Sequence, residues 1–311
     1  MAYKIVFAFF KLLSFLPFRL LYCLSDCGFA IIYFLVRYRR NIVRRNLVSS
    51  FPEKSLKEIE AIERRFYRWF CDYLIEAVKL LSISDKELRR RFQINNIEEV
   101  EQCFRQGQNA AAILGHYCNW EWLSCVGIAL PPSRVMGLIY HPLRNQIFDR
   151  LFRQMRLSQP SAIAVPKKDI LRELVRLKRD GAMSLFGYIA DQGPKWENIH
   201  LWLPFLGHDT PVFTGAERIM RKMGDAVFYV SMSRPRRGYY SCTFKLITKT
   251  PAQMPEFEIT KQFFRLLEAD IRREPSYYLW SHNRWKRTHE EFDRRYKVEN
   301  GKVVSRQQND R

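Results

Sequence analysis

The residues best suited to chemistry are a histidine and an acid in the stretch "LGHYCNWEW" (residues 114–122). His116 and Glu121 are five positions apart, so on one straight helix their side chains would point in different directions. They can meet only if a turn separates them, and Asn119 is placed to cap a helix that begins there. A carboxylate that accepts one ring N–H would fix the tautomer and leave the other nitrogen as a general base. The alternative is a surface histidine beside an unrelated acid at a helix start.

A second group of polar residues follows another apolar stretch. Asp191 and Gln192 come directly after "AMSLFGYIA" (residues 182–190), which reads as a buried strand. In open α/β sheets, ligands bind beyond the carboxyl ends of the strands, so these residues are expected on the same rim as His116. Four arginines occupy the basic helix predicted between two of the strands, and a guanidinium grips phosphate oxygens well. These arginines are Arg144, Arg150, Arg153 and Arg156. At least two of the four are expected to lie on a solvated helix face instead.

Metal and cofactor chemistry is not predicted. The seven cysteines form no CxxC pair and no zinc spacing, and no P-loop or dinucleotide fingerprint is present. The cysteines sit in apolar stretches and are expected to be reduced core residues. Cys118 lies two positions from His116, but neighbouring residues in an extended segment point apart, so a Cys/His nucleophile is disfavoured.

The chain around these residues alternates between apolar runs and helical patterns. Such alternation predicts an α/β fold, an αβα sandwich around a mostly parallel sheet, with antiparallel edge strands from the later pair of runs. Two capping boxes, Ser55 with Glu58 and Ser84 with Glu87, predict helix starts. The predicted strands are residues 110–114, 135–140, 161–165, 182–190, 226–233 and 239–248, and the predicted helices are 119–130, 143–156, 169–180, 213–223 and one from Thr260.

Composition limits the partners. The chain has 311 residues, 47% of them hydrophobic, enough for a substantial core. Its 52 Lys and Arg against 32 Asp and Glu give a net charge of +20. This surplus predicts a polyanionic partner: nucleic acid, an anionic membrane face or an acidic carrier protein.

The amino terminus favours membrane association. Residues 5–36 are mostly apolar, and the arginine-rich stretch "FLVRYRRNIVRR" then follows without a signal-peptide cleavage site. The positive-inside tendency places these arginines on the cytoplasmic face. A tilted anchor, a hairpin and an interfacial helix all remain open, because the longest uncharged run is too short for a clean span. We therefore expect an anchor and basic segment over residues 1–50 and a catalytic domain over 51–311, the alternative being a buried amphipathic helix of a soluble domain.

Several of these stretches resemble one known family, the bacterial lipid A biosynthesis acyltransferases. Its Gly-His-aromatic-x-Asn-Trp-Glu motif is matched by residues 115–121. Four further stretches are similar in the same order, namely "RRNIVRRNLVSSFPEKS", "YHPLRNQIFDRLFRQMR", "ADQGP" and the Trp-x-His-x-Arg signature in "YYLWSHNRWKRT". Two positions depart from the family pattern, Cys118 and His141, and they bear on which acceptor is used.

The resemblance implies a membrane-associated αβα acyltransferase at the cytoplasmic face of the inner membrane. Its donor would be an acyl carrier protein thioester, and its acceptor a hydroxyl of a phosphorylated glycolipid, the lipid A precursor. His116 would then be the general base, oriented by Glu121, and Arg156 or Arg153 or backbone N–H groups near Gly115 would stabilise the oxyanion or hold a phosphate. Asp191 would position the acceptor or one of these arginines.

Two alternatives to this function stay open. One is an acyltransferase acting on another lipid, a lysophospholipid or an aminolipid. The other is a basic, membrane-tethered nucleic-acid-binding protein, which we disfavour because the basic and aromatic residues form no recognisable reading module.

Overall fold

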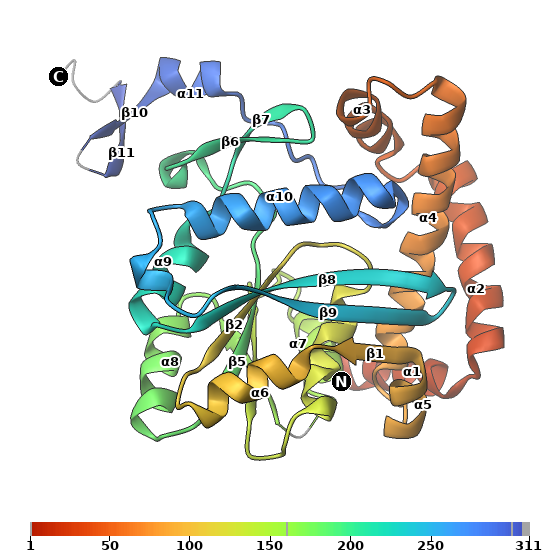
Figure 1. Cartoon of the computed structure of the whole chain (residues 1–311). Coiled ribbons are helices and arrows are strands. Elements are labelled where there is room, and N and C mark those ends of the chain that lie inside the picture. The colour runs from red at the N-terminus through yellow and green to blue at the C-terminus, as the bar shows by residue number, and fades with distance from the viewer. Residues whose placement is uncertain (1, 160, 300, 307–311) are drawn as a thin grey trace.

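A seven-stranded sheet forms the centre of the computed structural model, which describes residues 2–159, 161–299 and 301–306 (Figure 1). Its strand order is β1-β9-β8-β2-β5-β3-β4. The strands are β1 (Phe92–Asn95), β2 (Ala110–Leu114), β3 (Val135–Tyr140), β4 (Ala162–Pro166), β5 (Ser184–Ile189), β8 (Ala226–Arg236) and β9 (Tyr239–Thr248).

The sheet is mostly parallel and covered on both faces. Every neighbouring pair runs parallel except β8 with β9. β2 is buried along its whole length, which requires cover on both faces, and helices α6 (Ile97–Arg105) and α10 (Glu258–Arg273) both pack against it. The predicted α/β sandwich around a mostly parallel sheet is therefore confirmed.

The edge of the sheet differs from the prediction. The antiparallel pair β8 and β9 forms as expected, but β9 is not an edge strand, because β1 pairs with it in parallel from Phe92–Tyr240 to Asn95–Thr243. Sequence periodicity misses β1 because a strand of four residues directly after a charged helix offers too short a pattern.

Most predicted helix boundaries agree with the structure. Ser55 and Glu58 form the expected capping box, and the Ser84 hydroxyl accepts the Glu87 N–H at 3.3 Å. The stretch after the His116 motif is a 3₁₀ helix rather than an α-helix, over Trp120–Ala129. The remaining helices near the sheet are α4 (Leu56–Lys79), α5 (Asp85–Arg91), α7 (Gln146–Arg156), α8 (Ile170–Arg179) and α9 (Gly215–Met223).

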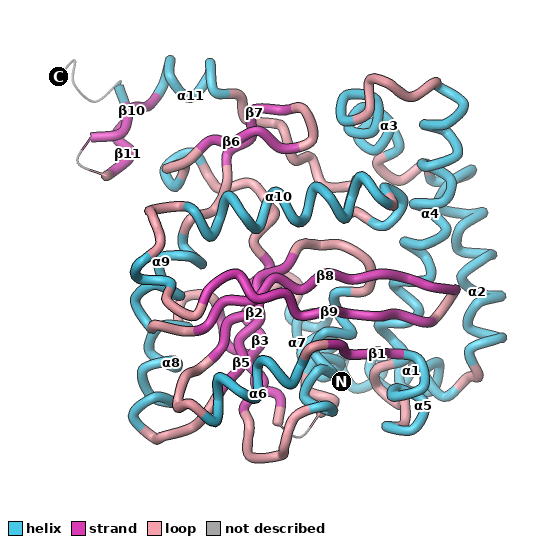
Figure 2. Tube along the Cα trace, in the orientation of Figure 1, coloured by secondary structure: helices cyan, strands magenta, loops and turns pink. Residues whose placement is uncertain are grey.

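The amino-terminal helices lie around α4 at one side of the sheet (Figure 2). They are α1 (Ala2–Phe15), α2 (Phe18–Ala30) with its π-helical continuation (Ile31–Val36), and α3 (Arg40–Ser50), and all of them contact α4. By length and composition, one described stretch, Phe18–Val36, could cross a membrane.

The two faces of α2 differ in chemistry. Toward α4, Tyr22 donates to Glu76 at 2.9 Å and Ser25 donates to Asp72 at 2.6 Å, while Asp26 pairs with Arg237 at 2.7 Å. The opposite face, with that of α1, carries large exposed apolar side chains: Ile5, Phe9, Leu12, Phe15, Leu20, Leu24, Ile31, Phe34, Leu35 and Val36. The body of the protein thus binds the polar groups of α2 together with Phe18 and Leu21, and leaves a second, apolar face uncovered.

The carboxyl-terminal part returns to the amino-terminal helices before it ends. Asn46 of α3 donates its amide to the backbone oxygens of Trp280 and His282, at 2.9 and 3.0 Å. Beyond these residues the chain continues into α11 (His289–Arg295) and a β10–β11 hairpin (Tyr296–Glu299 and Lys302–Ser305), which lie in Figure 1 with the β6–β7 hairpin (Trp202–Phe205 and His208–Pro211) beyond α10. The segment around Trp280 therefore contacts the amino-terminal helix α3 and then continues into the carboxyl-terminal elements.

Candidate active site

Local backbone constraints position His116 just beyond strand β2. A side chain on Gly115 would place its Cβ 2.8 Å from Leu267 of α10, so the tight approach needs a glycine. Cys118 has a left-handed backbone (φ 51°), and this turn separates His116 from the helix that follows. The backbone of His116 also accepts the Leu279 N–H at 3.2 Å, which ties the motif to the carboxyl-terminal segment.

The ring of His116 meets the polar residues at the end of strand β5. Its Nδ1 lies 2.6 Å from Asp191 Oδ1, and its Nε2 lies 3.3 Å from the side-chain nitrogen of Gln192. An ionised carboxylate can only accept, so Nδ1 carries the proton and Nε2 presents its lone pair. The expectation that β2 and β5 bring His116 and Asp191 to one rim is confirmed.

The electrostatics keep Asp191 ionised although it is buried. Burial alone would raise the pKa of this carboxyl, but the His116 ring, and more weakly the Arg284 guanidinium, outweigh it and hold the pKa below its usual value. The carboxylate can therefore hold the His116 tautomer and stabilise a positive charge on the ring.

The predicted hydrogen bond between His116 and Glu121 is not formed. Glu121 is 4% exposed and accepts two bonds from Arg156 of α7, at 2.8 and 2.7 Å, and one from Tyr73 at 3.4 Å. The turn at Cys118 is the physical reason, because it directs His116 toward β5 and Glu121 toward α7. Asp191 occupies the orienting position that the sequence assigned to Glu121.

The predicted side-chain cap by Asn119 is also wrong. Asn119 is fully buried and makes no capping bond; its amide donates to Glu76 Oε2 at 2.7 Å. Glu76 also accepts from Tyr22 of α2 and from Tyr240 of β9, both within 3 Å. Asn119 therefore connects the motif to a buried carboxylate rather than to open solvent.

The arginines of the predicted basic helix separate into two kinds. Arg144, Arg150 and Arg153 are exposed, as expected for a solvated helix face, whereas Arg156 is only partly exposed and held by both oxygens of Glu121. With Nε and Nη2 bound to Glu121, Nη1 of Arg156 makes no hydrogen bond to another described residue.

Two residues near the pair were not among the predicted site residues. Burial lowers the pKa of His282 to about 4, with the Asp191 carboxylate opposing the shift, so this ring is neutral near pH 7. Arg284 is 3% exposed and donates to the Pro211 oxygen, but its Nε and Nη1 have no hydrogen-bond partner among the described residues. The Trp-x-His-x-Arg signature contains both, so the sequence did hold a signal for them.

The described residues offer no group of three or more potential metal ligands. All seven cysteines are free. Cys118 is buried, and burial raises the pKa of its thiol well above the usual value, which leaves little thiolate for nucleophilic attack.

A histidine whose free nitrogen is set by a buried carboxylate, at the carboxyl edge of a parallel sheet, has the geometry that a general base requires. Comparison with known proteins names the class more closely. A family-wide sequence model described as bacterial lipid A biosynthesis acyltransferase matches residues 2–287, and the chain belongs to this family. The protein is therefore an acyltransferase.

Individual relatives are distant. The chain is 24% identical over 259 residues to a lipid A biosynthesis palmitoleoyltransferase of Escherichia coli (strain K12), covering 81% of this chain and 80% of that protein. A lipid A biosynthesis acyltransferase of Shigella flexneri shows the same identity and coverage. Among solved structures, the 1-acyl-sn-glycerophosphate acyltransferase PlsC of Thermotoga maritima is 13% identical with a TM-score of 0.35, covering 87% of this chain and 97% of that one.

Proposed function

We propose that the protein transfers a fatty acyl chain from an acyl carrier protein thioester to a hydroxyl of a phosphorylated glycolipid, a lipid A precursor. The single observation that carries the mechanism is the 2.6 Å contact between His116 Nδ1 and Asp191 Oδ1. Family membership supports the reaction class, and the net charge of +20 suits an acidic carrier protein and a phosphorylated acceptor.

The reaction uses His116 as general base. Its Nε2 accepts the proton of the acceptor hydroxyl while the hydroxyl oxygen bonds to the thioester carbonyl carbon. The tetrahedral intermediate then breaks its C–S bond, and the leaving thiolate takes the proton back from the ring. Asp191 stabilises the imidazolium between these two steps. The Gln192 amide contacts Nε2 in the free enzyme, so it gives way when the hydroxyl arrives.

Glu121 and Arg156 act as a second pair in this mechanism. The carboxylate holds the guanidinium by two bonds, and the remaining Nη1 donates to the oxyanion of the intermediate or to an acceptor phosphate. Exposed Arg144 and Arg153 of the same region are candidates for the outer part of the acceptor. Asn119 anchors the motif by donating its side-chain amide to the buried Glu76 carboxylate.

The amino-terminal helices provide membrane attachment at the cytoplasmic face of the inner membrane. Two functional units result, residues 1–50 for attachment and 51–311 for acyl transfer. The polar bonds of α2 to Asp72, Glu76 and Arg237 favour an interfacial position, because a spanning α2 would draw these charged groups into hydrocarbon. The uncovered apolar side chains of α1 and α2 would then lie among the lipids.

The assay that tests this function uses the full chain with labelled acyl carrier protein thioester. A phosphorylated glycolipid, a lysophospholipid and an aminolipid are compared as acceptors. We expect transfer to the glycolipid, and a loss of at least about a hundredfold in His116→Ala, the usual cost of removing a general base. Transfer to another acceptor alone would overturn the proposed substrate, and full activity of His116→Ala would overturn the mechanism.

A further inference from the structure

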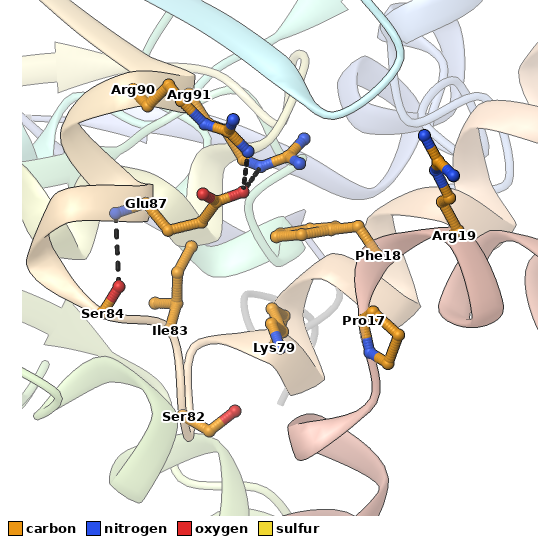
Figure 3. Close-up of a pocket in the computed structure, with 10 residues that line it drawn as sticks. All are labelled: Pro17, Phe18, Arg19, Lys79, Ser82, Ile83, Ser84, Glu87, Arg90 and Arg91. Carbon is orange, nitrogen blue, oxygen red and sulfur yellow. Dashed lines mark hydrogen bonds and ion pairs between the residues drawn. The ribbon is translucent and has the colours of Figure 1, made fainter.

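A positively charged pocket lies away from the His116 site, where the chain turns between α1 and α2 (Figure 3). Pro17 separates these helices, and the residues after it face the end of α4 and the start of α5 across a hollow of about 390 Å³. The cations that line it are Arg19, Lys79, Arg90 and Arg91, and the lining carboxylate is Glu87.

Charge in this pocket is not balanced. Arg90 and Arg91 both donate to the same oxygen, Glu87 Oε1, at 2.7 and 2.5 Å. Lys79 is bound by the backbone oxygens of Ser14 and Leu16 and by no carboxylate of the described chain. One carboxylate therefore serves two guanidiniums and leaves a net positive pocket.

Arg19 adds to this excess because it forms no ion pair or hydrogen bond with another described residue. In Figure 3 its guanidinium stands on the far side of the Phe18 ring from Glu87.

The pocket also has an aromatic wall. Phe18 lies between two cations, with the Arg91 guanidinium carbon 3.8 Å and Lys79 Nζ 5.4 Å from the ring centroid. These contacts hold the cations in place without neutralising them. A pre-positioned set of guanidinium and ammonium donors is well matched to the oxygens of a phosphate group.

The surroundings indicate the form in which that phosphate arrives. Phe15 and Leu20, just outside the lining segment on either side, are 63% and 51% exposed. Apolar side chains directly beside an anion pocket suit a ligand that joins a phosphate to hydrocarbon chains. A free phosphate ion would leave these side chains in water.

We propose that this pocket binds the phosphate headgroup of an anionic phospholipid and so fixes the orientation of the enzyme on the membrane. The inference rests on the proposed membrane attachment, but not on the chemistry at His116. In this proposal the turn between α1 and α2 binds a specific ligand. It does more than contribute to the general attraction between a basic protein and an anionic surface.

The test compares two charge-matched double variants of the full chain. Arg19→Gln with Arg90→Gln removes two pocket cations, and Arg172→Gln with Arg176→Gln removes two exposed arginines from α8, on the other side of the molecule in Figure 1. Co-sedimentation measures binding to vesicles of phosphatidylcholine with and without phosphatidylglycerol. Acyl transfer to detergent-dispersed acceptor and thermal unfolding check that both variants remain intact.

We expect the pocket variant to bind the phosphatidylglycerol vesicles about thirtyfold more weakly than the wild type, since each juxtamembrane charge contributes about 1 kcal/mol. The α8 variant should lose less than about threefold. Equal losses in both variants, or none in the pocket variant, would overturn the proposal.

Two further outcomes identify other ligands and also overturn it. If glycerol phosphate stabilises the wild type but not the pocket variant, while vesicle binding is unchanged, the ligand is a soluble phosphate. If the pocket variant instead raises KM for the acyl carrier protein thioester alone, the partner is that protein. A wild type that transfers acyl chains but binds no vesicle would refute membrane attachment and leave the His116 mechanism standing.

Discussion

His116 Nδ1 lies 2.6 Å from Asp191 Oδ1, although the two residues are 75 positions apart in the chain. The parallel pairing of β2 with β5 creates this contact, since both residues follow directly on the ends of adjacent strands. Because the carboxylate lies two residues beyond β5, the site exists only when the sheet is assembled.

The first prediction concerns this contact. Asp191→Asn should lower kcat by roughly 10²- to 10⁴-fold with little change in KM, because a neutral amide neither selects the Nδ1–H tautomer nor stabilises the imidazolium. Steady-state kinetics with purified protein measure the effect. A change in KM alone would instead assign Asp191 to acceptor binding.

A double-mutant cycle tests the Glu121–Arg156 pair. Glu121→Gln and Arg156→Gln should each reduce kcat/KM, and the double variant should be little worse than either single one, with a coupling of about 1–3 kcal/mol. Arg172→Gln, which removes an exposed arginine of α8, serves as the control and should change activity less than about threefold. Fully additive losses would show that the two residues act independently, against the prediction.

The pH dependence of stability should carry a contribution from Asp225. Burial raises the pKa of this carboxyl to about 6, so the folded state favours the protonated form. The unfolding free energy should therefore fall as pH rises from about 4 to about 6 and stay lower above that range. Asp225→Asn should remove this term and gain roughly 3 kcal/mol relative to the wild type at pH 7. Urea unfolding at pH 4 and pH 7 measures it, and an equal difference at both pH values would contradict the assignment.

Packing inside the sheet is tested at a glycine of β3. A Cβ at Gly137 would lie 2.2 Å from the Phe186 ring of β5, so Gly137→Ala should destabilise the fold by about 1–3 kcal/mol. Gly215 of α9 has no atom within 4 Å of such a Cβ, and Gly215→Ala should be neutral or stabilising. Thermal unfolding of both variants provides the comparison, and similar melting temperatures would show that Phe186 can move aside.

The sequence predicted the elements better than the contacts between them. Strand and helix positions follow from local periodicity, which is why the stretches at 110–114 and 135–140 were located correctly. The partner of His116 depends instead on a left-handed turn at Cys118, and a cysteine gives no local signal for that backbone. Family resemblance pointed to Glu121 because the motif contains it, but spacing in a motif does not specify which side chains touch.

The buried supports were missed for a related reason. Glu76 reaches the motif from a distant helix, and a lone charged residue in an apolar stretch looks the same in sequence whether it faces solvent or the core. Arg284 belongs to the Trp-x-His-x-Arg signature, but the signature does not say that its guanidinium is buried near Asp191. Only the folded chain distinguishes the two cases.

The bonds from Asn46 to the oxygens of Trp280 and His282 also affect the order in which native contacts form during synthesis. During translation the amino-terminal helices leave the ribosome long before the segment that they must clasp. These contacts, and the bond from the Leu279 N–H to the His116 oxygen, can therefore form only late in synthesis, once the carboxyl-terminal segment has been made.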